Sequence, residues 1–250
     1  MYKDKRVTVI LPTYNEKDSI KKVINDFFLI RDATNLEIVD EVLVINNNAK
    51  EGTSEEVSQT KAIEIIEPVQ GYGAAIQRGF KEASGDLIVV CEPDDTFVAI
   101  DIIKLLSYSE DVDIVYGSRT IKNFIWKGAN MGWFLRWGNW AVAKMIEVLF
   151  NTNYLSDVGC TFRLINRDAL NKMQDKFMVQ SSFFGPEMMV LGFLLKIPCV
   201  QIPVNYKNRE GVSSVTGNFF KAFKLGIQMI ILIFSMRFCI EKKIIKLLQK

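Results

Sequence analysis

The stretch LIVVCEPDDT, residues 87–96, decides how this chain folds. Its apolar beginning predicts a short buried strand over residues 86–91. The strand runs directly into three carboxylates, Glu92, Asp94 and Asp95. Unpaired acids repel one another at a strand end, and a hard divalent cation relieves that repulsion because carboxylates are its preferred ligands. The alternative is an acidic loop that only caps the next helix.

The same order of strand, polar loop and helix recurs through residues 1–120. Apolar runs predict further strands at 6–11, 42–45, 63–66 and 113–116. This alternation is typical of an α/β fold with a parallel sheet, in which ligands bind at the carboxyl ends of the strands. Polar clusters follow the strands at such ends: residues 14–16, 46–48, 92–95 and Arg119. We therefore expect one nucleotide-type site on that edge of the sheet.

Composition narrows the possible functions. The 250 residues suffice for one large domain or two small ones, and the net charge of +2 does not favour a nucleic-acid binder. The absence of histidine excludes histidine triads and histidine-ligated metals, which leaves acid–base chemistry to carboxylates. Four widely spaced cysteines and a start without an apolar signal core predict a protein that stays in the cytoplasm.

Gly71 and Gly73 open the helix that follows the third predicted strand. A GxG sequence is also compatible with a simple tight turn. The dinucleotide-binding pattern GxGxxG is not met, because Ile76 stands at the third glycine and no strand-end acid follows at the usual distance. The pattern argues against a nicotinamide-dependent dehydrogenase.

The second half of the chain is richer in aromatic residues. Residues 126–150 predict either an aromatic wall for an apolar or sugar ligand, or a core helix preceded by a packed loop. Residues 157–163 lead into a strand that extends through Ile165, and an apolar helix at 183–195 carries Glu187 near its start. After a strand at 200–206, the basic, hydroxyl-rich residues 207–214 suit either a diphosphate or a solvated surface loop.

Residues 217–240 form the most apolar segment, and the tail 241–250 is basic and amphipathic. The apolar run is too short for a comfortable membrane span, which takes about 20 residues. We expect helices that lie in a membrane interface. The alternative is packing against the domain or a second subunit, so a homo-oligomer through the tail is also considered.

Taken in order, these motifs resemble family 2 glycosyltransferases with the GT-A fold. Within that family, the chain is most similar to the dolichol-phosphate mannose synthase-like branch of polyprenyl-phosphate glycosyltransferases. The resemblance is carried by VILPTYNE (9–16), GYGAAIQRGF (71–80), the acids after LIVV, YGSR (116–119), DVGCTFRL (157–164) and YKNREGVSS (206–214). It implies a GT-A type, Rossmann-like α/β sandwich with a mostly parallel central sheet, followed by C-terminal amphipathic helices at the membrane interface.

The resemblance also implies roles for individual residues. The base and ribose of a nucleotide-sugar donor are expected at Pro12, Tyr14, Glu16, Ile45 and Asn47. Glu92 and Asp94 match the acid pair that binds Mg²⁺ or Mn²⁺, and Arg119 and Arg209 match basic residues near the diphosphate. Further substrate contacts are expected at Gly73, Arg163 and Ser214.

Three features depart from the family pattern. Asn46 and Asn47 stand where two aspartates are usual, so the identity of the donor base stays open. The first metal-binding acid is Glu92 instead of aspartate, which makes Asp95 an alternative ligand. Ser214 replaces a lysine near the end of the basic loop.

The mechanism expected is a single displacement with inversion at the anomeric carbon. A polyprenyl-phosphate acceptor is already an anion and needs no base, whereas a hydroxyl of a glycan requires a carboxylate, for which Asp157 and Glu187 are the candidates. The other interpretations are an inactive nucleotide-sugar-binding membrane scaffold and a nucleotidyltransferase. The latter typically has a glycine-rich, lysine-bearing loop after the first strand, which LPTYNE lacks.

The domain organisation expected is a GT-A domain over 1–216 and a helical tail over 217–250. Residues 1–120 form the nucleotide-binding half and residues 121–216 the acceptor half. The tail places the enzyme on the inner face of the cell membrane, as a peripheral protein.

Overall fold

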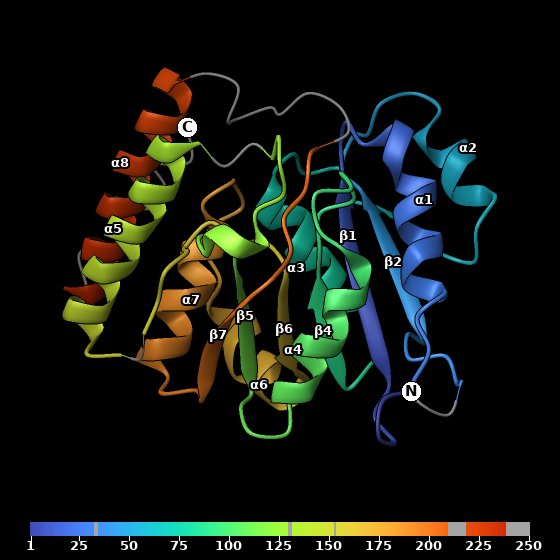
Figure 1. Cartoon of the computed structure of the whole chain (residues 1–250), viewed down its shortest axis with the longest axis horizontal. Coiled ribbons are helices and arrows are strands. Elements are labelled where there is room, and N and C mark those ends of the chain that lie inside the picture. Colours follow the sequence, from blue (N-terminus) through green and yellow to red (C-terminus); the bar gives the residue numbers. More distant parts are fainter. Residues whose placement is uncertain (33–34, 130–131, 153, 210–218, 239–250) are drawn as a thin grey trace.

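The computed structural model describes residues 1–32, 35–129, 132–152, 154–209 and 219–238. In these residues, one twisted sheet carries helices on both faces (Figure 1). The strands are β1 (Val7–Thr13), β2 (Glu41–Asn46), β3 (Ile63–Ile66), β4 (Leu87–Val90), β5 (Ile114–Ser118), β6 (Arg163–Asn166) and β7 (Cys199–Pro203). The α-helices are α1 (Lys17–Phe28), α2 (Thr53–Ser58), α3 (Tyr72–Glu82), α4 (Ile102–Tyr108), α5 (Trp133–Phe150), α6 (Arg167–Met173), α7 (Phe184–Leu194) and α8 (Phe219–Arg237). Short 3₁₀ turns cover Ala99–Asp101, Lys122–Phe124 and Gln174–Lys176.

The strand order is β3-β2-β1-β4-β6-β5-β7. The pairs β1–β2, β1–β4, β2–β3 and β5–β7 are parallel, whereas β6 is antiparallel to both β4 and β5. The mostly parallel sheet predicted from the sequence is therefore confirmed. Because β6 begins at the edge where its neighbours end, the loop 157–162 before it joins the same edge as the carboxyl ends of the parallel strands.

Alternate residues of the central strands enter two separate hydrophobic cores. In β1, Val9 and Leu11 pack with α1 and α4, whereas Ile10 packs on the opposite face with α3, α6 and α7. This period of two is the geometry of a strand covered on both sides. Apolar runs in the sequence are thus explained by a sheet with no solvent-facing surface at its centre.

Helices α5 and α8 lie beside each other at one end of the molecule, against α7 (Figure 1). Ala143 of α5 and Leu232 of α8 are fully buried in the core that α7 shares. On the outer side, Trp133 is 72% exposed and Trp137 is 49% exposed. The core-helix interpretation of residues 126–150 therefore holds only for the inner side of α5, because these tryptophans face solvent.

Several boundaries differ from the sequence-based expectation. The strand predicted at 200–206 ends at Pro203, and Tyr206 instead makes isolated bridges with Phe97 and Ile125. The expected halves 1–120 and 121–216 share one sheet, since β6 and β7 complete it. The tail beyond Phe238 and most of the basic loop lie outside the described residues. No helix in the described parts of the chain has the length and hydropathy needed to cross a bilayer.

Candidate active site

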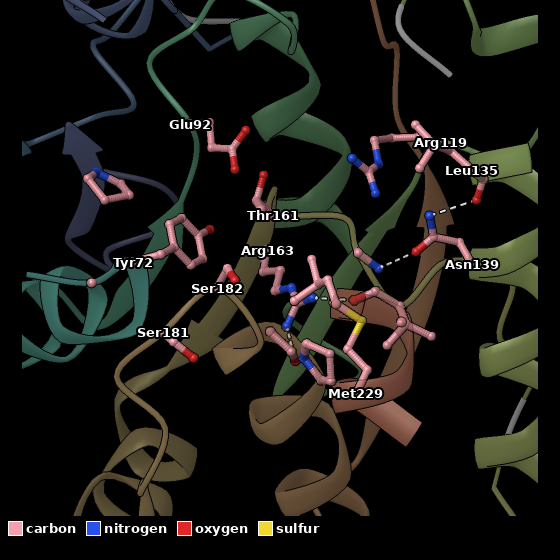
Figure 2. Close-up of a pocket in the computed structure, with 18 of the residues that line it drawn as sticks. Tyr72, Glu92, Arg119, Leu135, Asn139, Thr161, Arg163, Ser181, Ser182 and Met229 are labelled. Atoms are coloured by element: carbon pink, nitrogen blue, oxygen red, sulfur yellow. Dashed lines mark hydrogen bonds between the residues drawn. The ribbon is translucent and has the colours of Figure 1, made fainter. Parts of the chain in front are cut away.

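A cavity of about 710 Å³ opens at the carboxyl edge of the sheet. Its polar half is lined from the ends of different strands, which brings together predicted residues that are far apart in the sequence: Pro12, Tyr14, Glu16, Asn47, Glu92, Arg119, Arg163 and Arg209. Glu92 and Arg119 approach the cavity from opposite walls (Figure 2). The grouping on one edge follows from the parallel sheet.

The other half of the cavity is apolar. It is lined by Leu135 and Val142 of α5 and by Leu225, Met229 and Ile230 of α8. In Figure 2, Leu135 lies beside Arg119 and Met229 lies at the lower centre of the view. One continuous space therefore has a charged end at the sheet and a hydrocarbon-lined end between the two outer helices.

Glu16 organises the turn that follows β1. Its Oε2 accepts hydrogen bonds from the backbone N–H groups of Tyr14 (2.7 Å) and Asn15 (2.8 Å). Its Oε1 accepts a hydrogen bond from the Arg209 guanidinium at 2.9 Å. The carboxylate thus fixes the loop over the strand end and positions an arginine at the cavity.

Glu92 carries a carboxylate to which no described residue donates a hydrogen bond. Burial and the adjacent Asp94 raise the pKa of Glu92 to about 8, against the opposing charges of Arg209 and Arg119. A positive charge that enters the cavity would stabilise the ionised form of this buried carboxyl group.

Asp94 has two unlike oxygens. Its Oδ1 accepts hydrogen bonds from the backbone N–H (3.0 Å) and hydroxyl (2.6 Å) of Thr96. Its Oδ2 is buried and receives no hydrogen bond from the described residues, although Arg209 Nη1 lies 3.0 Å away as an ion pair without hydrogen-bond alignment. One oxygen anchors the side chain and the other is left for a cation.

Asp95 is not placed as a metal ligand. Its Oδ1 is held by Lys22 at 2.8 Å and by Lys207 at 2.7 Å. Asp95 has a positive φ of 60°, a left-handed conformation that aspartate tolerates better than most residues. The alternative ligand suggested by the sequence is therefore not supported, because two lysines already neutralise it.

Glu92 and Asp94 fit a divalent cation that also binds a substrate. No group of three or more acidic or cysteine side chains gathers as a metal site in the parts of the chain that the structure describes. Mg²⁺ in nucleotide-binding enzymes commonly takes one or two carboxylates and completes its shell with phosphate oxygens and water. The orphaned Asp94 Oδ2 and the Glu92 carboxylate in the cavity wall are the two protein groups that could hold such a cation.

Asp157 is a structural partner of Arg119 and is not exposed to the cavity. The Arg119 Nε and Nη2 bond its two oxygens at 2.9 and 3.0 Å, and the backbone N–H of Arg119 adds a third bond. Burial acts to raise the pKa of Asp157, but the Arg119 charge and hydrogen bonds outweigh it and lower that pKa. The expectation of a general base at Asp157 is contradicted by this geometry, since its lone pairs are occupied.

Glu187 does not line the cavity, although its neighbours Gly185 and Pro186 do. It is fully buried, and its two oxygens accept hydrogen bonds from the backbone N–H groups of Met178 (2.8 Å) and Val179 (3.0 Å). Burial raises the pKa of Glu187 to about 7. It holds the segment before α7 and does not reach a substrate, so the second candidate base is likewise contradicted.

That segment explains the paired glycines. The Gln180 carbonyl accepts a hydrogen bond from the Ala74 N–H at 3.0 Å. A Cβ on Gly73 would stand 2.5 Å from the Val179 carbonyl oxygen, and one on Gly71 would collide with Gln180. Gly73 therefore serves close backbone packing and does not line the cavity, contrary to its predicted role as a substrate contact.

Arg163 lines the cavity but is largely committed to the backbone. Its guanidinium donates to the carbonyls of Cys160 (2.6 Å), Gly185 (2.6 Å) and Val158 (3.0 Å), as Figure 2 shows in part. It closes the loop before β6 against α7. Its expected contact with substrate is limited to the N–H groups that these carbonyls leave unused.

Of the residues expected around the nucleotide base, some line the cavity and others do not. Ile45 is fully buried in the core and cannot touch a ligand. Asn47 lines the cavity, but its Nδ2 donates to the carbonyls of Glu67 and Val69, and its Oδ1 accepts from Gln70 and the Gly71 N–H. The Asn47 amide thus shapes the loop 67–71, and its hydrogen-bonding capacity is already used. Ser214 lies outside the described residues.

Sequence patterns did not indicate several lining residues: Gln70, Tyr72, Asn139, Thr161, Ser181 and Ser182. Asn139 bridges α5 to the loop before β6 by accepting from the Gly159 N–H at 3.0 Å (Figure 2). Ser181 Oγ is buried without a hydrogen-bond partner in the described structure. Tyr72, inside GYG, and Thr161, inside DVGCTFRL, stand within motifs of the sequence, although neither was assigned a role there.

Residues 8–174 match the family model described as glycosyl transferase family 2. This chain belongs to glycosyl transferase family 2. The match runs from β1 to α6 and includes the cavity-lining residues Glu16, Glu92 and Arg119, whereas Arg209 lies outside it. The predicted family and the predicted enzyme class, a glycosyltransferase, are confirmed.

Two curated relatives resemble this glycosyltransferase over most of its length. A dolichyl-phosphate beta-glucosyltransferase of Trichomonas vaginalis is 26% identical over 228 residues, covering 82% of this chain and 67% of the relative. A low-salt glycan biosynthesis hexosyltransferase of Haloferax volcanii is 26% identical over 211 residues, covering 84% of this chain. The chain spans about half, 49%, of that second relative.

Solved structures share the fold. Glucosyl-3-phosphoglycerate synthase of Mycobacterium tuberculosis, in complex with Mn²⁺, UDP-glucose and phosphoglyceric acid, superimposes with a TM-score of 0.71. Identity is 16%, and the match covers 94% of this glycosyltransferase and 80% of the mycobacterial chain. The α/β architecture expected for a family 2 enzyme is confirmed by this likeness.

Proposed function

We propose that this enzyme transfers a hexosyl group from a nucleoside-diphosphate sugar to a polyprenyl phosphate, at a membrane surface and with inversion at the anomeric carbon. The observation that carries the proposal is the cavity itself, whose polar half at the sheet is continuous with an apolar half between α5 and α8. A donor diphosphate is charged, and a polyprenyl phosphate is charged at one end and hydrocarbon along the rest. The donor diphosphate suits the polar half of the cavity. The polyprenyl phosphate suits both halves, with its phosphate at the polar end and its hydrocarbon chain along the apolar walls.

The donor occupies the polar half. Glu92 and Asp94 would hold Mg²⁺ or Mn²⁺, and such a cation supplies neutralisation of the diphosphate as it departs. Arg209 at the cavity adds a preorganised positive charge to the same end. The fold neighbour solved in complex with Mn²⁺ and UDP-glucose supports a nucleotide-sugar donor and a divalent cation.

The acceptor needs no general base. The carboxylates lining the described cavity are Glu16, which is committed to the β1 turn and Arg209, and Glu92, which we assign to the cation. An acceptor phosphate is already anionic, so its oxygen attacks the anomeric carbon directly. The new carbon–oxygen bond forms as the bond to the diphosphate breaks, and the electron pair leaves with the diphosphate. The name of the Trichomonas relative supports a dolichyl-type phosphate.

The membrane is reached through the outer helices. Ile227, Ile231 and Phe234 of α8 are each between 38% and 44% exposed, and the neighbouring helix α5 exposes Trp133 and Trp137. Tryptophan favours the boundary between lipid and water. A hydrocarbon acceptor in the apolar half of the cavity could thus remain continuous with the bilayer. This assigns the proposed lipid contact to both α5 and the segment 217–250.

A transfer assay identifies the donor nucleotide and tests the acceptor. Purified full-length enzyme is supplied with Mn²⁺, a polyprenyl phosphate in detergent, and UDP-, GDP-, CDP- or dTDP-hexoses, and the lipid product is identified by mass spectrometry. We expect a polyprenyl-phosphate hexose from one nucleotide series, with inverted configuration by NMR, and none when polyprenol replaces polyprenyl phosphate. Equal transfer to polyprenol, or transfer only to glycan hydroxyls, would overturn the proposed acceptor.

A further inference from the structure

Arg209 joins two acids that come from different strand ends. Its Nη2 lies 2.9 Å from Glu16 Oε1, and its Nη1 lies 3.0 Å from Asp94 Oδ2. The Asp94 side chain is 1% exposed and that of Arg209 is 21% exposed. A guanidinium therefore stands at the one Asp94 oxygen that Thr96 does not already hold.

A divalent cation on Asp94 would need the same oxygen. Oxygen ligands bind Mg²⁺ at about 2.0–2.1 Å, so a cation on Oδ2 would be adjacent to Nη1 and strongly repelled by it. Because Oδ1 is fixed by two hydrogen bonds, the carboxylate has little freedom to serve both partners. Arg209 and a metal ion are thus mutually exclusive partners of Oδ2.

Arg209 also has donor capacity left over. Its Nε is buried and has no hydrogen-bond partner in the described structure. The residue lines the polar half of the cavity, so an N–H group that loses or lacks a protein acceptor there can be satisfied by an oxyanion of a ligand. Its bond to Glu16 would keep the side chain in place during such an exchange.

We propose that Arg209 is the resident counter-ion of Asp94, competing with the divalent cation for Oδ2 and released by it to the donor diphosphate. The second part of this inference, the release of Arg209 to a diphosphate, rests on the proposed function. The first part, the competition for Oδ2, involves only the free enzyme and a metal ion. It makes cation binding by the enzyme weak until the guanidinium has another anion to pair with.

The test measures Mn²⁺ alone, without nucleotide, binding to the full-length protein by electron paramagnetic resonance of free Mn²⁺. Arg209→Gln removes the competing charge, and we expect it to bind Mn²⁺ about tenfold more tightly than wild type, a difference of about 1.4 kcal/mol. Lys207→Gln is the matched control. It also removes one positive charge, two positions before Arg209 in the sequence, but Lys207 pairs with Asp95 and not with Asp94. We expect its Mn²⁺ affinity to change by no more than about twofold, the part that general electrostatics supplies.

Equal or weaker Mn²⁺ binding by Arg209→Gln than by wild type would overturn the proposal, as would equal tightening in Lys207→Gln. Should Arg209→Gln fold poorly by thermal unfolding without metal, Arg209→Lys replaces it, with a smaller gain expected because one ammonium cannot reach both acids. Asp94→Asn separates this inference from the proposed function. If it abolishes Mn²⁺ binding, the metal assignment stands whatever Arg209→Gln does; if it does not, both the assignment and the inference fall.

Discussion

At the scale of single residues, acids that look alike in the sequence differ by their partners in the fold. Spacing after an apolar strand pointed to Glu92, which lines the cavity, and to Asp94, which is buried and contacts Arg209 at the cavity wall. It could not separate them from Asp95, because the lysines that neutralise Asp95 come from α1 and from the segment after β7. Asp157 and Glu187 were misassigned as bases for the same reason: their partners are set by tertiary structure, which local sequence does not encode.

The Asp157–Arg119 pair gives a first prediction. Asp157→Asn removes the fully buried counter-charge of Arg119, whose side chain is only 13% exposed, so we expect the free energy of unfolding to fall by about 3 kcal/mol, the lower end of the range for breaking a buried pair. Urea unfolding followed by circular dichroism measures this loss. Asp111→Asn, at an exposed site, serves as control and should change stability by less than about 0.5 kcal/mol. An Asp157→Asn variant as stable as wild type but without transferase activity would restore Asp157 as a base.

Glu187 gives a prediction on pH. Because its folded pKa of about 7 exceeds the ordinary value, the folded state binds the proton more tightly, and the contribution of this group to stability falls as pH rises from about 4.5 through 7. Glu187→Gln lacks this titration. We expect the stability of wild type relative to Glu187→Gln to be greater at pH 5 than at pH 8, by on the order of 1–3 kcal/mol. A difference that is constant or grows with pH, in urea unfolding at both pH values, would contradict the assignment.

At the scale of elements, apolar runs identified the strands from β1 to β5 with small errors at their ends. The direction of β6 could not be read in this way, because hydrophobic periodicity is the same for a parallel and an antiparallel strand. Its reversal matters, since it brings the loop 157–162 to the cavity edge. For α5, aromatic content suggested burial, but the tryptophans lie on the side that α7 and α8 leave uncovered.

The outer surface of α8 can be tested directly. The double substitution Ile231→Glu with Phe234→Glu places charges on two exposed apolar positions without entering the core. We expect its partition onto phosphatidylglycerol-containing vesicles to fall about tenfold or more in co-sedimentation, since each half-exposed apolar side chain contributes on the order of 1 kcal/mol in lipid. Leu29→Glu, 68% exposed at the end of α1 and distant from α8 in Figure 1, should bind vesicles as wild type does. Equal loss in both variants would indicate a general charge effect instead.

At the scale of the whole molecule, the cavity is a product of two regions that the sequence presents separately. The sheet edge supplies the charges, and residues of α5 and α8, far apart along the chain, supply the apolar walls. The sequence indicated an α/β glycosyltransferase with an apolar C-terminal segment. It could not indicate that this segment closes the same cavity as the strand ends, because that depends on packing of α8 against α5 and α7.

The central claim is that Glu92 and Asp94 hold a cation through which the sheet edge binds a nucleoside diphosphate. It is tested most directly by the thermal stability of the full-length protein with UDP, GDP, CDP or dTDP, each with and without Mn²⁺. One nucleotide at about 100 times its dissociation constant should add roughly 2.7 kcal/mol, only with Mn²⁺ present. Asp94→Asn should lose this dependence on the cation, and Asp95→Asn should keep it. Stabilisation that is the same without Mn²⁺, or that survives unchanged in Asp94→Asn, would contradict the account.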